Sequence, residues 1–240
     1  MKTNAPYQWL LFDADGTLFD YNQAETNALT GAFADFDLPF DARAAALYRD
    51  INHQVWLDFE HGRISAEDLR VVRFERLFAA LRLSDRIDSE QFSRRYLVHL
   101  SESSVLLDGA FETVTALRAD YRLALITNGL SEVQRPRLAR SPLADFFEVL
   151  AISEEMGIAK PAAGFFDMVI ERTGFPPKER LLIIGDSLSS DILGGVNAGI
   201  DTCWVNPDGL PADPRIPATY EIRHLSELAG ILSNGRERGA

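Results

Sequence analysis

Short apolar runs that end abruptly in polar residues or glycine recur along this sequence, and they constrain its fold more than any other feature. The first run, at 8–12, passes directly into Asp13-Ala14-Asp15-Gly16-Thr17. Runs of this length predict strands, and their apolar character throughout predicts strands that are covered on both faces, as in a parallel sheet. The same design recurs in four more segments, the last of them weaker: 122–126, 147–152, 181–184 and 202–205.

Helical patterns separate the later runs. They are predicted at 131–140, at 164–173, and from 189 or 190 to about 197, with Gly199 as the stop signal. Strands that alternate with helices in this way favour an α/β fold, built as a doubly wound parallel sheet.

Residues 20–103 break this alternation, because their apolar positions recur at intervals of three and four, as in Ala44 to Phe59 and Leu69 to Leu81. We therefore expect an all-helical domain over 20–103, inserted into an α/β core that is formed by 1–19 and 104–240. The arginines of this block are expected on its solvated faces: Arg70, Arg73, Arg76, Arg94 and Arg95.

Charge and cysteine content narrow the classes of function. The chain has 24 Lys and Arg against 36 Asp and Glu, a net charge of -12, which opposes binding to nucleic acid polymers and to anionic membranes. The single cysteine, Cys203, has no internal disulfide partner, no leader pattern opens the chain, and no apolar run approaches the roughly 18 residues of a membrane span. A cytoplasmic protein with a small-molecule partner is expected, and the oligomeric state stays open.

Reactive side chains stand where the predicted strands end, and ligands of open parallel sheets bind at that edge. Taken singly, each has an ordinary structural explanation, as a turn former, a helix cap or a solvated side chain. Their joint occurrence at successive strand ends favours a functional site. The candidates are Asp13, Asp15, Thr127, Asn128, Asp186 and Ser187, together with Lys160 upstream of the fourth strand and Asp191 in the following helix.

Carboxylates that gather at one strand edge repel each other unless a cation lies among them or some are protonated. The sequence therefore predicts a metal ion, and ligands that are all oxygen favour a hard ion such as Mg²⁺. The chemistry that fits is phosphoryl transfer to a carboxylate. Asp13 would attack phosphorus, Lys160 and Thr127 would hold the phosphoryl oxygens, and Asp15, two residues on, would act as general acid and then as general base.

Four stretches that contain these residues resemble, in order and approximate spacing, the motifs of the haloacid dehalogenase-like phosphatases. They are Asp13-Ala14-Asp15-Gly16-Thr17-Leu18, Thr127-Asn128-Gly129, Lys160-Pro161, and Gly185-Asp186-Ser187 with Asp191. The resemblance implies Asp13 as nucleophile and Asp15 as general acid/base, and it implies a helical cap of the C1 type inserted after the first motif. True dehalogenases lack the acid at the Asp15 position, so its presence favours a phosphatase.

The same resemblance implies how phosphate and metal are held. Thr127 and Lys160 would be catalytic residues that bind phosphate, and we include Asn128 beside them in the phosphate-binding set. The implied Mg²⁺ site consists of Asp13, the backbone carbonyl of Asp15 and Asp186, with Asp191 in support.

Further stretches resemble the bacterial nucleoside 5'-monophosphatases, a branch associated with pyrimidine nucleotides: 152–161, 190–199, 202–206 and, in the expected cap, 55–59. The core stretches also resemble N-acylneuraminate-9-phosphate phosphatases, so a sugar phosphate is an alternative substrate, and a phosphomutase is not excluded. A phospho-acceptor signalling module is the alternative from a different class. Asp15 argues against it, because a base beside an aspartyl phosphate promotes its hydrolysis.

Overall fold

The computed structural model describes residues 7–234, so the ends of the expected core ranges, 1–6 and 235–240, lie outside the described residues. The described chain divides into two compact units. The core unit comprises 7–20, 105–129 and 138–234, and the helical unit comprises Tyr21–Ser104 and Leu130–Arg137. Helix α6 (Ser131–Arg140) therefore contributes residues to both units.

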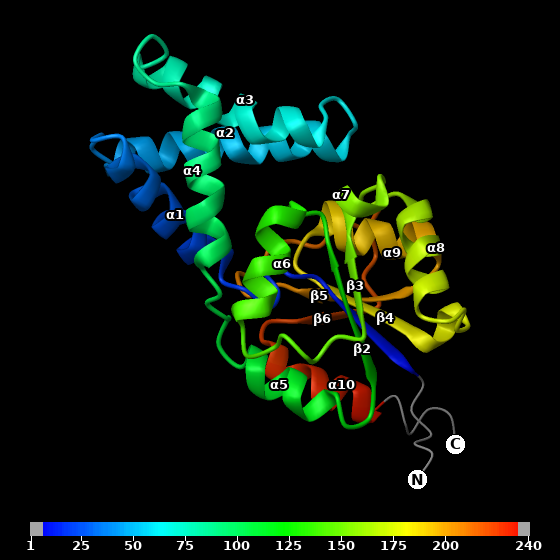
Figure 1. Cartoon of the computed structure of the whole chain (residues 1–240). Helices are drawn as coiled ribbons and strands as arrows, with labels where there is room; N and C mark the ends of the chain where they lie inside the picture. The colour runs from blue at the N-terminus through cyan, green and yellow to red at the C-terminus, as the bar shows by residue number, and fades with distance from the viewer. Residues whose placement is uncertain (1–6, 235–240) are drawn as a thin grey trace. The chain divides into compact units, whose positions relative to one another are not determined.

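The core unit is built on a six-stranded parallel sheet in the order β3-β2-β1-β4-β5-β6 (Figure 1). Central strand β1 pairs with both β2 and β4, so that Leu10 lies beside Leu123 on one side and Leu182 on the other. The five predicted strands are confirmed. The bounds are β1 Trp9–Phe12, β2 Arg122–Thr127, β3 Val149–Ile152, β4 Leu181–Gly185, β5 Asp201–Val205 and β6 Tyr220–Ile222. Strand β6 was not predicted, because its three residues are too few to show a strand pattern.

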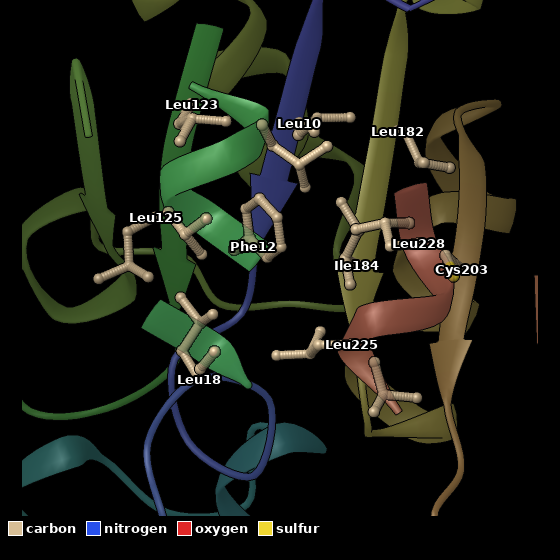
Figure 2. Packing of buried hydrophobic residues seen from close by; sticks show 14 of the residues in the cluster. Leu10, Phe12, Leu18, Leu123, Leu125, Leu182, Ile184, Cys203, Leu225 and Leu228 are labelled. Carbon is tan, nitrogen blue, oxygen red and sulfur yellow. The ribbon is translucent and has the colours of Figure 1, made fainter. Parts of the chain in front are cut away.

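Alternate strand residues face two separate apolar clusters. On one face, Leu10, Phe12 and Ile184 pack with residues of α5 and α10, beside buried Cys203 (Figure 2). On the other face, Trp9 and Leu11 pack with residues of α8 and α9. Helices thus cover both faces, as the doubly wound fold requires, which explains why the strands are apolar throughout. The bounds of the core helices are α5 Ala110–Leu117, α7 Ser153–Met156, α8 Ala163–Arg172, η1 Lys178–Arg180, α9 Leu193–Ala198, η3 Leu225–Glu227 and α10 Leu228–Asn234.

The helix predicted from Ser189 or Ser190 has a different start. A π-helical turn, η2 (Leu188–Ile192), precedes α9, which ends just before Gly199, the expected stop signal, with that glycine at φ 68°. Ser187 caps this turn by accepting a hydrogen bond from the N–H of Ser190. Single π-helical turns occur frequently at functional sites.

The helical unit contains four longer helices, of which α1 packs with α4 and α2 packs with α3. Their bounds are α1 Tyr21–Asp35, α2 Ala42–Glu60, α3 Ala66–Leu81 and α4 Ser89–Glu102. Three phenylalanines of this unit, Phe74, Phe78 and Phe92, are fully buried and contact each other.

The expectation for Arg73 was wrong, because this side chain is buried rather than solvated, at 1% exposure. Its guanidinium lies 5.0 Å from the centre of the Tyr96 ring, and its Nη1 donates to Oδ1 of Asn52 at 3.4 Å. The amide of Asn52 in turn donates to the buried carboxylate of Glu25. Apolar periodicity locates the buried face of a helix but does not reveal a cation that is stabilised there by aromatic rings and a carboxylate.

No helix within residues 7–234 has both the length and the apolar character that a membrane crossing requires.

Candidate active site

Asp13 stands directly after β1, at the carboxyl end of the sheet. Its N–H donates to the carbonyl of Ile184 on β4 at 2.8 Å, which fixes the main chain at this point. The chain then turns through Gly16, at φ 81°. A Cβ at this position would collide with the carboxylate of Asp186, so glycine lets the first motif approach the fourth. Thr17 completes the contact by donating its hydroxyl to Oδ1 of Asp186 at 3.2 Å.

Lys160 lies at the centre of the site, and only 1% of its surface is exposed. Its ammonium group donates to Oδ1 of Asp13 at 2.6 Å, to Oδ1 of Asp191 at 2.6 Å and to the carbonyl of Ile126 at 3.1 Å. Burial alone would lower the pKa of Lys160, but the carboxylates of Asp13 and Asp191 raise it above its ordinary value. The side chain therefore stays charged, with all three N–H groups in use.

The side-chain amide of Asn128 binds the main chain of Lys160 at both ends. Its Nδ2 donates to the Lys160 carbonyl at 2.9 Å, and its Oδ1 accepts from the Lys160 N–H at 2.9 Å. This pair anchors the loop that carries the lysine to the end of β2. The side chain of Asn128 thus positions the lysine, and phosphate binding by Asn128 stays a prediction.

Asp191 lies in the turn η2 with none of its surface exposed. Its Oδ1 accepts from Lys160, and its Oδ2 accepts from the N–H of Ser187 at 3.1 Å. A Cβ on residue 185 would collide with this carboxylate, so Gly185 makes the room that Asp191 occupies.

The carboxylates of Asp13, Asp186 and Asp191 form one cluster, in which one oxygen from each lies within 4.8 Å of the others. Burial raises the pKa of Asp13 well above its usual range; Lys160 opposes this rise, while Asp191 and Asp186 add to it. Burial, followed by repulsion from Asp191, raises the pKa of Asp186 to about 7. When all three carboxylates are ionised, they exceed the single ammonium by two negative charges, and a donor set of carboxylate oxygens fits a hard divalent cation.

Thr127 and Asp15 stand at the same edge of the sheet. Thr127 ends β2, where its buried hydroxyl accepts from the N–H of Gly129 at 3.0 Å. Asp15 is half-buried in the loop after β1 and forms an isolated bridge with Phe19. Lys160 thus joins Asp13 to Asp191, the carboxylate of Asp186 lies beside them, and Thr127, Asn128 and Asp15 stand at the ends of neighbouring strands.

Several supporting groups were not predicted from the sequence. These are the Thr17 hydroxyl, the Ser187 N–H, the Ile126 carbonyl and the indole of Trp204, which donates to the carbonyl of Asp186 at 2.9 Å. Hydrogen bonds over such long sequence separations leave no local pattern. In the sequence, the close packing around Asp186 and Asp191 is indicated by Gly16 and Gly185, each of which lies next to an aspartate of a motif.

The chain is similar to a known protein family and to solved structures. The family model of the haloacid dehalogenase-like hydrolases matches residues 7–199. The HAD-hydrolase YfnB of Bacillus subtilis is 40% identical over 95% of this chain and 96% of its own length. A crystal structure of YfnB, described as bound to magnesium and as revealing interdomain movement, matches with a TM-score of 0.89 over 94% of this chain and 98% of that chain.

Two further relatives are described as pyrimidine 5'-nucleotidases. YjjG of Escherichia coli is 36% identical over 94% of this chain and 98% of its own length. PynA of Streptococcus pneumoniae is 36% identical over 94% of this chain and 95% of its own. With its fold, its motifs and these relatives in agreement, the chain belongs to the haloacid dehalogenase-like hydrolases.

Proposed function

We propose that this hydrolase is a Mg²⁺-dependent phosphatase that acts through an aspartyl phosphate and prefers pyrimidine nucleoside 5'-monophosphates. The observation that carries the chemistry is the contact between the Asp13 carboxylate and the buried ammonium of Lys160, inside a cluster of three carboxylates. The similarity to YjjG and PynA supports the substrate class.

The carboxylates of Asp13 and Asp186 and the backbone carbonyl of Asp15 would hold Mg²⁺, with Asp191 in support. The fit rests on the excess of negative charge and on the all-oxygen donor set. When bound, Mg²⁺ supplies the positive charge that reduces repulsion between the Asp13 carboxylate and an anionic phosphate.

In the first step, a carboxylate oxygen of Asp13 attacks phosphorus and forms a new P–O bond, while the bond from phosphorus to the leaving oxygen breaks. Asp15 gives its proton to that oxygen, so the nucleoside leaves as an alcohol. Thr127 donates its hydroxyl to a phosphoryl oxygen, and one N–H of the Lys160 ammonium moves to the phosphoryl group from a partner that it has in the free chain, while Asn128 keeps the lysine backbone in place.

In the second step, Asp15, now a carboxylate, takes a proton from water as the water oxygen attacks phosphorus. The bond between phosphorus and Asp13 breaks, inorganic phosphate leaves and the Asp13 carboxylate is restored. The same residue thus serves as acid and base in turn. This is what distinguishes the proposal from a phospho-acceptor module, in which the aspartyl phosphate has to persist.

We further propose that the helical unit is a cap that recognises the leaving group, as the expected insertion of 20–103 implies. The partner would be a small phosphomonoester. The cytoplasmic location stays a prediction.

Phosphate release from a panel of pyrimidine and purine nucleoside 5'-monophosphates and sugar phosphates tests the proposal, with Mg²⁺ and with EDTA. We expect turnover that requires Mg²⁺ and is fastest with pyrimidine nucleotides, and none from Asp13→Asn. Faster turnover of a sugar phosphate would replace the substrate class. A phosphosugar isomer as product would indicate a mutase, and phosphoprotein that persists without turnover would indicate a phospho-acceptor.

A further inference from the structure

The indole of Trp204 contacts the main chain of a candidate metal ligand. Trp204 lies on β5 with its ring buried, and its Nε1 donates to the carbonyl of Asp186 at 2.9 Å. The pairing of β4 with β5 extends to Gly185 and Trp204, and Asp186 is the first residue beyond β4. A side chain rather than a strand neighbour therefore holds this carbonyl.

The carbonyl of Asp186 and the N–H of Ser187 belong to one planar peptide group. Trp204 binds its carbonyl, and Asp191 binds its N–H through Oδ2 at 3.1 Å. The group is thus fixed at both ends, since a rotation that kept one hydrogen bond would break the other.

This peptide group links the two carboxylates that flank it in the cluster. Asp186 carries its carbonyl, and the carboxylate of Asp191 accepts its N–H. The Asp186 carboxylate has a separate contact with the Thr17 hydroxyl, and that of Asp191 has one with Lys160. If the indole bond is lost, the peptide group can turn, and the directions of both carboxylates change with it.

We propose that Trp204 is a positioning residue for the metal site: its indole N–H orients the Asp186–Ser187 peptide group and so directs the Asp186 and Asp191 carboxylates toward Mg²⁺. This inference rests on the proposed function in that it takes Mg²⁺ as the cation of the site. Groups that orient metal ligands commonly change metal affinity by about 10- to 100-fold when they are removed.

The chain offers a matched control in the same unit. The indole nitrogen of Trp9 is also buried, but within the described residues it has no hydrogen-bond partner. Trp9→Phe and Trp204→Phe therefore remove the same atoms from buried positions of one sheet, and only the second breaks a hydrogen bond.

Mg²⁺ binding to the full-length protein, measured by calorimetric titration, tests the proposal. We expect the Mg²⁺ dissociation constant of Trp204→Phe to rise about tenfold and that of Trp9→Phe to change less than twofold, with both variants showing a cooperative urea transition in EDTA. Equal Mg²⁺ affinity in the two variants would overturn the proposal. If the unsubstituted protein binds no Mg²⁺, the proposed metal site fails, and this inference fails with it.

A second measurement uses the unsubstituted chain and does not depend on how the variants fold. The sequence has three tryptophans, so the ¹⁵N–¹H spectrum should contain three indole signals. Addition of Mg²⁺ should shift the Trp204 signal and leave that of Trp9 in place. A Trp204 signal that stays in place at saturating Mg²⁺ would refute the inference.

Discussion

Asn128 and Lys160 form a two-point contact, in which one side-chain amide both donates to and accepts from the backbone of the lysine at 2.9 Å. The two residues are 32 positions apart, so the contact joins the second motif to the third. It fixes the loop at the residue whose ammonium group binds Asp13 and Asp191. The position of a buried cation in this site therefore depends on an uncharged neighbour.

Asn128→Ala should lower kcat/KM for the preferred substrate about 10- to 100-fold, because both hydrogen bonds to the Lys160 backbone are lost. The free energy of unfolding should fall by about 1–3 kcal/mol. Steady-state kinetics and urea unfolding measure the two effects. Asn197→Ala is the matched control, because Asn197 donates one exposed hydrogen bond to the carbonyl of Pro161, the residue that follows Lys160. Equal kinetic loss in the two variants would contradict the role of Asn128.

Asp13→Asn and Asp15→Asn should fail in different ways. The amide at 13 cannot form the acyl phosphate, so turnover should drop at least about a thousandfold and no phosphoenzyme should appear. The amide at 15 can act neither as general acid nor as general base, so both steps should slow. Phosphoenzyme should accumulate with a substrate whose leaving group needs no protonation, such as p-nitrophenyl phosphate. Acid quench with radiolabelled substrate or intact-protein mass spectrometry detects the intermediate. Normal turnover in either variant would remove that residue from its proposed role.

Gly16→Ala should reduce both stability and Mg²⁺ affinity. Any side chain at φ 81° costs about 1–2 kcal/mol, and here the added Cβ also collides with the carboxylate of Asp186. Gly109→Ala is the control, because Gly109 has a similar φ of 76° and nothing lies within 4 Å of the Cβ that would be added. Urea unfolding should show a similar backbone cost in both variants, whereas calorimetric titration should show at least tenfold weaker Mg²⁺ binding in Gly16→Ala alone. Unchanged Mg²⁺ affinity in Gly16→Ala would mean that Asp186 does not direct the cation.

The ion pairs of Asp35 should make the stability of the helical unit depend on pH in the acid range. Hydrogen bonds from Arg95 and His99, at 2.7 and 2.9 Å, lower the pKa of the Asp35 carboxyl in the folded chain. A lowered carboxyl pKa contributes stability that is present above the unfolded value near 4 and is lost as the pH falls through the folded value. The difference in unfolding free energy between the unsubstituted chain and Asp35→Asn should therefore be larger at pH 5.5 than at pH 3.

Urea unfolding at these two pH values measures that difference. Arg95→Gln removes the first partner and should shrink the same pH-dependent difference. A difference that grows toward pH 3 would have the wrong sign and would contradict the assignment.

The sequence was sufficient for the sheet, because five strands are apolar on both faces and stop at polar residues. It was insufficient where structure depends on contacts distant in the chain. Strand β6 is too short to show a period, and buried Arg73 is stabilised by the Tyr96 ring and by Asn52 rather than by anything adjacent in sequence. The side-chain amide of Asn128 binds the Lys160 backbone, a contact that no local pattern encodes.

The place of β1 at the centre of the sheet has a consequence for how the chain is made. β1 is complete at Phe12, but its neighbours β2 and β4 begin only at Arg122 and Leu181. The four helices α1 to α4 lie between β1 and β2 in the sequence, and they pack against one another. Their contacts join residues closer in sequence than those that β1 makes with β2 and β4, so they form faster than the pairing of these strands. On the ribosome, these helices should therefore assemble before β1 has paired with a neighbouring strand. Chains that stop short of β4 would leave one apolar edge of β1 open, and we expect them to aggregate.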